Sequence, residues 1–424
     1  MNGVHLLTSD QLDEFITITG DAYPALNLAL PDTKERTIAR MKQRMEQESI
    51  NFYGYFRDGQ LLGGMILYDY LLNFRSIQIP VGGVGMVAVD FLHKKEKVAK
   101  ELITFFIDHY RERKMPLALL YPFRPDFYKQ MGFGFGTKNN QYKVLPSAFP
   151  SNGEKRHLQY LTKEDVQLVR ECYDRLFAHT HGMIKKTDLD LRALFDNPEN
   201  RLVGVKKGDT LHGYIVFSFK QEHELNFALN NMIVKEFIYE TPEVLSEICT
   251  FLNSQSDQIN RIVINTQDEF LHHLFDDARN GDVKLIPHVA HPINVAAIGL
   301  MYRVINQDAL WSYLAHHNFD GVNCKVKLTV HDSFINGSDN ITNPPPPSTI
   351  VHFVGGYPTR MEEGEEYEVE VKIGVADFSS MLMGVVPFSK LVSYGLAEVS
   401  NTEYVKRLGR IFQTSEKPIC TTMF

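Results

Sequence analysis

The pattern of hydrophobic and polar residues in the first third of the chain is typical of a mixed α/β domain. Residues 8–15, TSDQLDEF, have the hydroxyl cap and acidic first turn of a helix start, and residues 32–49 predict a second, mostly charged helix. Two runs rich in aromatic and β-branched residues flank Asp58-Gly59, which predicts a β-hairpin. The elements expected next are a strand (75–89), a helix (about 95–113), a buried strand (115–123), a short helical piece and a further strand.

The middle third repeats the order of elements expected over residues 51–131. A hairpin is expected around Gly208-Asp209, then a strand (224–240), a helix capped by Thr241, a strand (261–266) and a short helix (268–277). This order fits a degenerate internal repeat, with two merely similar α/β domains as the alternative. The turn before the capped helix, IYETPEV, has no basic cluster, so we expect that this copy does not hold a pyrophosphate.

The pattern changes from Asn294. Residues 294–314 are predicted to be helical, with Trp311 as the apolar anchor. Residues 321–335 and 366–386 alternate like strands, and the proline-rich segment 336–356 between them is expected to be a loop. Two closing helices are expected at 388–396 and 402–412.

Length and charge limit the possible functions. The 424 residues suit two or three domains, and the net charge of −8 gives no general basic field for nucleic acid. No signal peptide and no apolar stretch of about 18 residues is visible, so we expect a cytoplasmic protein without a membrane partner. The four cysteines are far apart and fit a reduced compartment: Cys172, Cys249, Cys324 and Cys420.

The sequence predicts no metal site. The pair His179 and His181 has no acidic or cysteine partner at ligand spacing. His272 and His273 are expected on a helix, where consecutive side chains point apart. Both pairs are interpreted as structural.

Residues 89–102, VDFLHKKEKVAKEL, carry the first candidate chemistry. A strand, a basic turn and a helix follow one another here, and the free amides and dipole of a helix N-terminus favour a pyrophosphate. Lys97 stands at the tightest point, where a glycine is expected because a Cβ would obstruct phosphate oxygens. The alternative is a solvated helix start.

Three motifs together resemble the Eis (enhanced intracellular survival) branch of the GNAT acetyltransferases. They are VGGVGMVAV followed by His93 and a basic pair, LLYPFRPDFYKQMGFG, and the apolar end CTTMF. The resemblance implies an α/β (α+β) fold with two tandem mixed-sheet domains and a third α/β domain. The implied domains are a GNAT acetyltransferase domain (1–148), a degenerate GNAT-like domain (149–287) and a sterol carrier protein-like domain (288–424). It also implies a homo-oligomer, a hexamer as in known members.

The same resemblance implies how acetyl-CoA, the acyl donor, would bind without a metal. The GNAT loop pattern R/Q-x-x-G-x-G/A becomes Lys94-x-x-Lys97-x-Ala99, which keeps charge and loses the glycine. Lysines can still hold a diphosphate as point charges, less rigidly than arginine forks. The residues expected to pair with pantetheine through their backbone are Met86, Val87, Ala88 and Val89, and those expected to face the diphosphate are Lys94, Lys95, Lys97 and Val98.

Tyr128 stands where GNAT proteins carry a tyrosine that donates to the leaving thiolate. A phenol has a reference pKa of about 10 and a thiol of about 8.5, so the phenol is a sensible donor. The alternative is an aromatic packing residue, as Tyr121, Tyr142 and Phe127 illustrate.

The chain ends in apolar residues, although chain ends are usually polar and frayed. This end is therefore expected to dock onto the protein. The resemblance implies that the terminal carboxylate of Phe424 is the general base, delivered from the third domain to the first. The alternative is simple hydrophobic docking of Met423 and Phe424.

The predicted activity is acetyl transfer from acetyl-CoA to a primary amine of a small cationic molecule or a lysine side chain. Direct attack is expected, because no activated nucleophile is visible in the sequence. Two alternatives stay open. One is a non-catalytic ligand-binding protein with a degraded CoA site, and the other is an acyltransferase for another acyl-CoA or acceptor.

Overall fold

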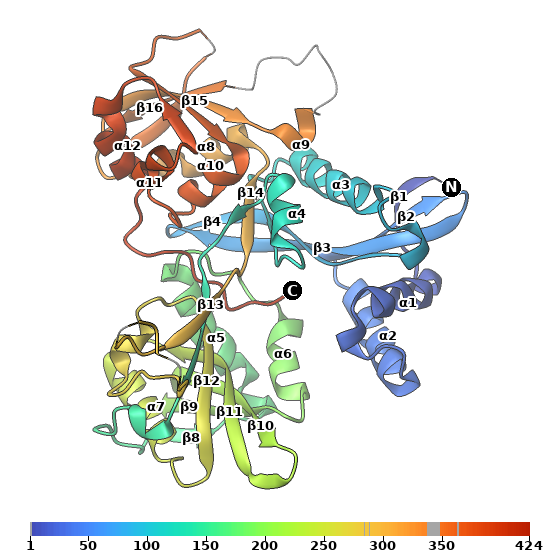
Figure 1. Ribbon diagram of the computed structural model, residues 1–424, viewed down its shortest axis with the longest axis vertical. Helices are drawn as coiled ribbons and strands as arrows, with labels where there is room; N and C mark the ends of the chain where they lie inside the picture. The colour runs from blue at the N-terminus through green and yellow to red at the C-terminus, as the bar shows by residue number, and fades with distance from the viewer. Residues whose placement is uncertain (1, 284, 288, 337–347, 363) are drawn as a thin grey trace.

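The computed structural model describes residues 2–283, 285–287, 289–336, 348–362 and 364–424, folded as three β-sheets with their helices (Figure 1). The first two sheets have seven strands each and the third has five. Each sheet is mixed, with helices packed against it. The α/β fold class predicted from the sequence is confirmed.

The first sheet has the strand order β1-β2-β3-β4-β5-β14-β6. The hairpin expected at Asp58-Gly59 joins β2 to β3, and both turn residues have positive φ, as the tight hairpin turn requires. The strands are β1 (Gly3–Leu6), β2 (Ile50–Arg57), β3 (Gln60–Phe74), β4 (Ile77–Val89), β5 (Leu117–Leu120), β6 (Gly134–Phe135) and β14 (Met301–Val304).

Helices cover both faces of this sheet. α1 (Leu12–Ala22) and α2 (Pro31–Met45) pack on one face, and α3 (Val98–Glu112) and α4 (Pro125–Gln130) on the other (Figure 1). The helix expected from about residue 95 begins only at Val98. Lys95 and Lys97 have positive φ, and this conformation interrupts a right-handed helix.

The second sheet repeats the first, with the order β13-β7-β12-β11-β10-β9-β8. From β8 to β12 a strand, two helices, three strands, a helix and a strand follow one another, as they do from β1 to β5. The repeat is therefore longer than predicted, because it also includes the strand and two helices that precede each hairpin. Its elements are β7 (Asn139–Val144), β8 (Leu158–Tyr160), α5 (Val166–His179), α6 (Asp188–Asp196), β9 (Arg201–Lys207), β10 (Thr210–His223), β11 (Asn226–Tyr239), α7 (Pro242–Asn253), β12 (Ile259–Thr266) and β13 (Asn294–Ala297).

The two sheets exchange strands. β7 precedes the second unit in the chain yet pairs with β12, and β14 follows that unit yet pairs with β5. The domain boundaries at 148 and 287 stay predictions.

The single helix predicted for residues 294–314 is wrong: β13 and β14 come first and α8 (Gln307–Tyr313) follows. A fully buried strand such as β14 gives an apolar run that periodicity cannot distinguish from a buried helix segment.

The third unit has the sheet order β17-β16-β15-β18-β19. Two expectations are corrected here: residues 366–386 turn from strand into helix α10, and Ser348–Val354 of the expected loop is a strand, while 337–347 lie outside the described residues. The elements are β15 (Cys324–His331), α9 (Ser333–Asn336), β16 (Ser348–Val354), β17 (Tyr357–Arg360), β18 (Val369–Gly374), α10 (Val375–Leu382), α11 (Phe388–Ser393), β19 (Ala397–Val399) and α12 (Val405–Phe412).

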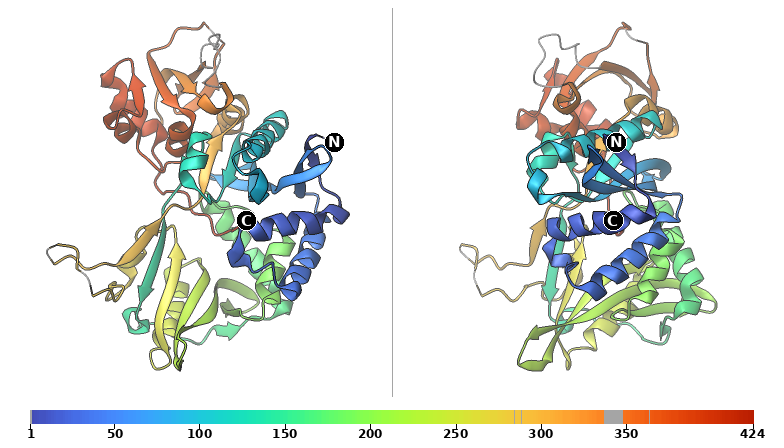
Figure 2. Two further views of the ribbon diagram at one scale, coloured as in Figure 1. Left: turned by 45° about the vertical axis from the view of Figure 1, so that its right-hand side comes forward. Right: turned by 90° about the vertical axis from the view of Figure 1, so that its right-hand side faces the viewer.

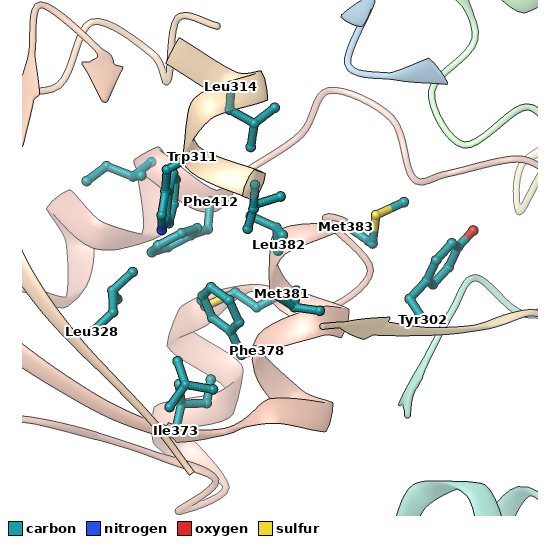
Figure 3. Packing of buried hydrophobic residues seen from close by; sticks show 14 of the residues in the cluster. Tyr302, Trp311, Leu314, Leu328, Ile373, Phe378, Met381, Leu382, Met383 and Phe412 are labelled. Carbon is teal, nitrogen blue, oxygen red and sulfur yellow. The ribbon is translucent and has the colours of Figure 1, made fainter. Parts of the chain in front are cut away.

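Large side chains fill the interior of the third unit. Trp311, Phe378 and Phe412 lie together with aliphatic residues of the sheet and helices (Figure 3). The same apolar cluster continues into Leu117 and Leu119 of the first sheet, which fixes the third unit on the first. None of the described helices has the length and apolar composition needed to cross a membrane.

The last residues leave the third unit and return to the centre of the molecule. We call residues 413–424 the C-terminal segment. It ends between the first and second sheets, where the C label lies in all three views (Figures 1 and 2). The expectation that the chain end docks onto the protein is confirmed: Thr422 is buried, and Phe424 packs against two apolar clusters.

Candidate active site

Two central strands of the first sheet separate part-way along their length. β4 and β5 are parallel neighbours from Val81 to Val84, and β5 ends at Leu120, the partner of Val84. β4 continues to Val89 and keeps only its other neighbour, β3. Residues 85–89 therefore have one edge that no strand of the described chain covers. We call this gap between β4 and the end of β5 the first opening.

β4 is bulged at the first opening. Met86 and Val87 lie opposite the single residue Met65 of β3, and Met86 has a φ of 49°. Bulges re-aim a strand and are frequent beside functional sites. The Tyr23 hydroxyl donates to the Val87 carbonyl oxygen at 2.7 Å, and the Tyr23 ring contacts the ring of Phe123, beyond β5. Tyr23 thus reaches across the first opening.

The turn after β4 presents cations that are free to meet an anion. Among the ion pairs of the described chain, none includes Lys94, Lys95 or Lys97, and the three side chains are exposed. Glu96, the acidic residue between them, pairs instead with Arg57 at 2.5 Å. The positive charge of this turn is therefore available to a ligand.

Lys97 takes the backbone conformation expected of a glycine. Its φ of 66° and ψ of 6° are left-handed, which costs of order 1 kcal/mol in a residue with a Cβ. It is the N-cap of α3, and its side chain caps no amide, so the first amides of the helix are open to an anion. Val98 as a whole is 1% exposed, so its side chain does not face a diphosphate.

Tyr128 lies on the short helix α4 beside the first opening. Its side chain is 6% exposed, and its ring packs edge-on against Phe133. Burial, and then the neighbouring Tyr23, raise the pKa of the Tyr128 phenol. The described residues offer the hydroxyl no hydrogen-bond partner, so it stays protonated and free to donate.

The last residue of the chain lies against β4 at the first opening. An alanine Cβ at Gly85 would lie 3.1 Å from the terminal carbonyl carbon of Phe424 and 3.4 Å from its oxygen. A Cβ at Gly83 would lie 3.1 Å from the Phe424 ring. Two glycines of the VGGVG run thus make room for the chain end, and its carboxyl stands at the gap in the sheet.

Three tyrosines surround the ring of Phe424. The ring centroids of Tyr68, Tyr70 and Tyr121 lie 5.6, 5.1 and 5.3 Å from that of Phe424. The Tyr121 hydroxyl also donates to the Thr422 carbonyl oxygen at 3.1 Å. Met423 is 73% exposed, so the docking involves Phe424 and not the methionine.

Three groups lie near residues 85–87 of β4. The Phe424 carboxyl lies at Gly85, Tyr23 binds the Val87 carbonyl, and Tyr128 is a neighbour of Tyr23. The basic turn follows directly on the same strand. Residues from both ends of the chain are thus assembled at one place.

Several residues of this site were not found by sequence reasoning. Gly83 and Gly85 had a usable signal, because glycine inside a strand often marks a close approach of other backbone. Tyr23, Tyr68 and Tyr70 had none, since the chain has 19 tyrosines without a distinguishing spacing.

The two histidine pairs lie in different surroundings. His181 is buried, its Nε2 lies 3.1 Å from the Met383 carbonyl oxygen, and burial lowers its pKa to about 4. The rings of His272 and His273 lie 4.2 Å apart, so the expectation that they point apart is wrong; their segment is a 3₁₀ turn. Within the described ranges, no group of three or more His, Cys, Asp or Glu residues could hold a metal ion.

Comparisons with known proteins identify three domains in the chain. Residues 4–136 match an acetyltransferase (GNAT) domain, residues 182–304 match another, and residues 310–421 match a sterol carrier protein domain. The chain has the domains and the fold of an Eis-like GNAT acetyltransferase. Its two acetyltransferase domains make it an acyltransferase, and GNAT domains use acyl-CoA, generally acetyl-CoA.

Solved structures share the whole architecture at low sequence identity. A GCN5-related N-acetyltransferase from Anabaena variabilis ATCC 29413 has a TM-score of 0.80 at 14% identity, and one from Kribbella flavida has 0.77 at 14%, each covering 99% of both chains. Eis1 from Mycobacterium abscessus has a TM-score of 0.76 at 17% identity over 100% of both chains. No curated protein matches the chain significantly. These neighbours establish the fold that the chain shares with them.

Proposed function

We propose that the protein transfers the acetyl group of acetyl-CoA directly to a primary amine, on a small cationic molecule or a lysine side chain. The observation that carries the proposal is the chain's own terminal carboxyl beside Gly85 at the first opening. The amine nitrogen attacks the thioester carbonyl carbon, a C–N bond forms, the C–S bond breaks and the amine loses a proton. A base and a thiolate-stabilising donor are the groups that this reaction needs.

In this proposal the carboxylate of Phe424 takes the amine proton, directly or through one water. A free terminal carboxyl has a pKa of about 3.3–3.7 and is a weak base for an ammonium. A carboxylate becomes more basic when apolar groups exclude water from it. The rings of Tyr68, Tyr70 and Tyr121 pack on the Phe424 ring, and we propose that the half-buried chain end places its carboxylate in such surroundings.

Tyr128 is the proposed donor to the leaving thiolate. Its raised pKa makes complete loss of the phenol proton unfavourable, so it acts mainly by hydrogen bonding to the sulfur as charge develops. Its hydroxyl has no partner among the residues that are described and is free to donate to a ligand. The hydroxyls of Tyr142 and Tyr302 share this property, so the proposed role depends on the place of Tyr128 beside the first opening.

The backbone of residues 86–89 is proposed to pair with pantetheine, and the basic turn to hold the diphosphate. The uncovered edge of β4 and the bulge at Met86 support the first assignment. The glycine-like conformation of Lys97 and the uncapped start of α3 support the second. Lys94, Lys95 and Lys97 add positive charge, and salt weakens the attraction between this charge and the diphosphate.

Of the alternative functions, the non-catalytic binding protein has less support. It would need an apolar pocket in the third unit, whose core is packed by side chains such as Trp311 and Phe378 (Figure 3). A cavity of about 1140 Å³ lies between this unit, the second unit and the C-terminal segment, and its lining includes the charged residues Glu403, Lys406 and Arg410. An acyltransferase for a different acyl-CoA or acceptor uses the same groups and differs only in the ligands. The first test is therefore calorimetry of acetyl-CoA binding, with longer acyl-CoA thioesters for comparison. It is followed by an assay of CoA thiol release in the presence of small amines and lysine peptides.

We expect one acetyl-CoA to bind and thiol release to require an amine. Failure to bind any acyl-CoA would overturn the proposal. Release without an amine would contradict direct transfer to one. The resemblance to Eis proteins also supports a cytoplasmic homo-oligomer, proposed as a hexamer, and sedimentation at the mass of a single chain would contradict that part.

A further inference from the structure

The second GNAT-like domain has an opening built like the first. β11 and β12 are parallel neighbours up to Val234 and Ile264, after which β11 runs on to Tyr239 without β12 beside it. The pairing of β11 with β10 shifts at the same place, between Val234 and Glu236. We call the gap between residues 235–239 and the end of β12 the second opening.

The chain's own C-terminal segment lies in the second opening. A cavity of about 580 Å³ there is lined by residues of both strands and also by Ile419–Thr421 and Met423. The amide of Cys420 donates to the side chain of Gln267, just beyond β12. The amide of Ile419 donates to the His181 carbonyl oxygen at 2.8 Å, and Gly182 leaves space for Pro418.

The helix that follows the second opening is closed to anions. The Thr241 side chain accepts a hydrogen bond from the Val244 amide, and Pro242 has no amide hydrogen to offer. Glu243 adds a negative charge in the first turn of α7. The cap, the proline and Glu243 therefore disfavour a CoA diphosphate at this helix start, and the C-terminal segment lines the cavity beside it.

Tyr173 of α5 is the side chain of this domain that holds the last residues. Its hydroxyl donates to the Ile184 carbonyl oxygen at 2.8 Å and lies 3.2 Å from Thr421 Oγ1 and 3.4 Å from Thr422 Oγ1. Because its own proton is used on Ile184, it accepts from the two threonine hydroxyls. Tyr173 is fully buried, so these contacts are shielded from water.

A buried ion pair fixes the Tyr173 ring. Lys186 Nζ lies 4.6 Å from the ring centroid and pairs with Glu236, and both charged side chains are almost completely buried. Tyr214 donates to the other Glu236 oxygen at 2.8 Å. Glu236 belongs to the stretch of β11 that lines the second opening. The cluster therefore stands directly beneath the C-terminal segment.

We propose that the second GNAT-like domain positions the catalytic chain end: its opening takes the C-terminal segment in place of a cofactor, and Tyr173 sets the place of the Phe424 carboxylate through Thr421 and Thr422. The inference rests on the proposed role of Phe424 as the base. Tyr173 is a positioning residue, since it touches neither acetyl-CoA nor the amine. The degenerate domain thus contributes to turnover without binding substrate.

The test compares Tyr173→Phe with Tyr142→Phe, a control at an equally buried tyrosine of the second sheet that lies outside the cluster beneath the segment. One readout is the rate at which carboxypeptidase Y releases Phe424 from the folded full-length protein, followed by mass spectrometry. The other is the kcat and KM for acetyl-CoA. Losing two hydrogen bonds should make release roughly 10- to 30-fold faster and lower kcat similarly, with KM for acetyl-CoA unchanged.

Tyr142→Phe should leave release and kcat near the parent values. Thr421→Val combined with Thr422→Val should reproduce the Tyr173→Phe effect, and adding Tyr173→Phe to them should change little more, because the three share one set of contacts. Parental release and kcat in Tyr173→Phe would overturn the inference, as would equal effects of the two tyrosine changes. Faster release at unchanged kcat would overturn the positioning role.

The failure of the proposed function is separately visible. If the parent protein acetylates no amine, the transferase proposal fails, while the release rates still show whether Tyr173 holds the segment.

Discussion

The first and second openings share a strand pair, a bulge and a following helix, and they differ in what surrounds them. Three lysines precede α3, and none of them pairs with a carboxylate in the described part of the chain. The helix starts at Lys97 without a side-chain cap. Before α7 stand a threonine cap, a proline and Glu243. The first opening has a free strand edge, and the second holds Ile419–Thr421 of the chain itself.

This difference shows how a repeated fold can divide one reaction between two copies. A GNAT opening is a strand edge that accepts an extended chain, and pantetheine and a polypeptide are both extended chains with amide groups. The residues at the start of the following helix decide whether the diphosphate of a bound cofactor can also be held there. The second opening, with no basic turn before its helix, instead holds the C-terminal segment, which ends at the first opening.

The largest effect on turnover is expected at Tyr128, the proposed donor at the first opening. Tyr128→Phe keeps the ring and removes the donor, so kcat should fall by about 10²–10⁴-fold with the fold retained. Steady-state kinetics measure kcat, and circular dichroism shows whether the fold is retained. Tyr142→Phe, a buried tyrosine of the second sheet, is the control and should stay near parental activity. Equal activity of Tyr128→Phe and the parent would return Tyr128 to a packing role.

The next effect concerns the glycine that separates β4 from the chain end. In Gly85→Ala the new Cβ would lie 3.1 Å from the terminal carbonyl carbon, so the carboxyl must shift. Misplacing a reacting group by up to 1 Å lowers turnover by roughly 10- to 100-fold. Gly409→Ala, where nothing lies within 4 Å of the new Cβ, is the control. Unchanged kcat in Gly85→Ala would mean that the carboxyl position does not matter.

A smaller effect is expected at the basic turn. Replacing both Lys94 and Lys95 by Ala should weaken acetyl-CoA binding about tenfold at low salt and less at high salt, because exposed point charges are screened. Calorimetry at two salt concentrations measures this, and the parent should bind one acetyl-CoA per chain. A second bound acetyl-CoA would contradict the difference between the openings. Binding unaffected by the double change would remove the turn from the site.

The smallest effect belongs to the helix start of the second opening. Thr241→Ala removes the cap of α7 and should lower the free energy of unfolding by about 1 kcal/mol. Acetyl-CoA affinity should not change, because this helix start faces no cofactor. Chemical denaturation and calorimetry give the two values. Weaker acetyl-CoA binding in this variant would contradict the structural role of the cap.

Local signals in the sequence predicted much of this architecture. The hairpins at Asp58-Gly59 and Gly208-Asp209, the capped α7 and the basic turn depend on neighbouring residues, so short patterns reveal them. β14 was misjudged because its partners, β5 and β6, lie far away in the sequence. The place of Phe424 was predicted from a resemblance, and its aromatic surroundings and Tyr173 were not, because they arise only when distant segments pack together.

The chain itself offers a direct test of the terminal carboxylate. Cys420 permits native chemical ligation of the peptide CTTMF to residues 1–419, with either a carboxylate or an amide at Phe424. The two products differ by one charged group and keep every side chain. With the carboxylate as base, the amide product should retain its acetyl-CoA affinity and lose kcat by about 10²–10⁴-fold. Equal kcat of the acid and amide products would contradict the role of the Phe424 carboxylate.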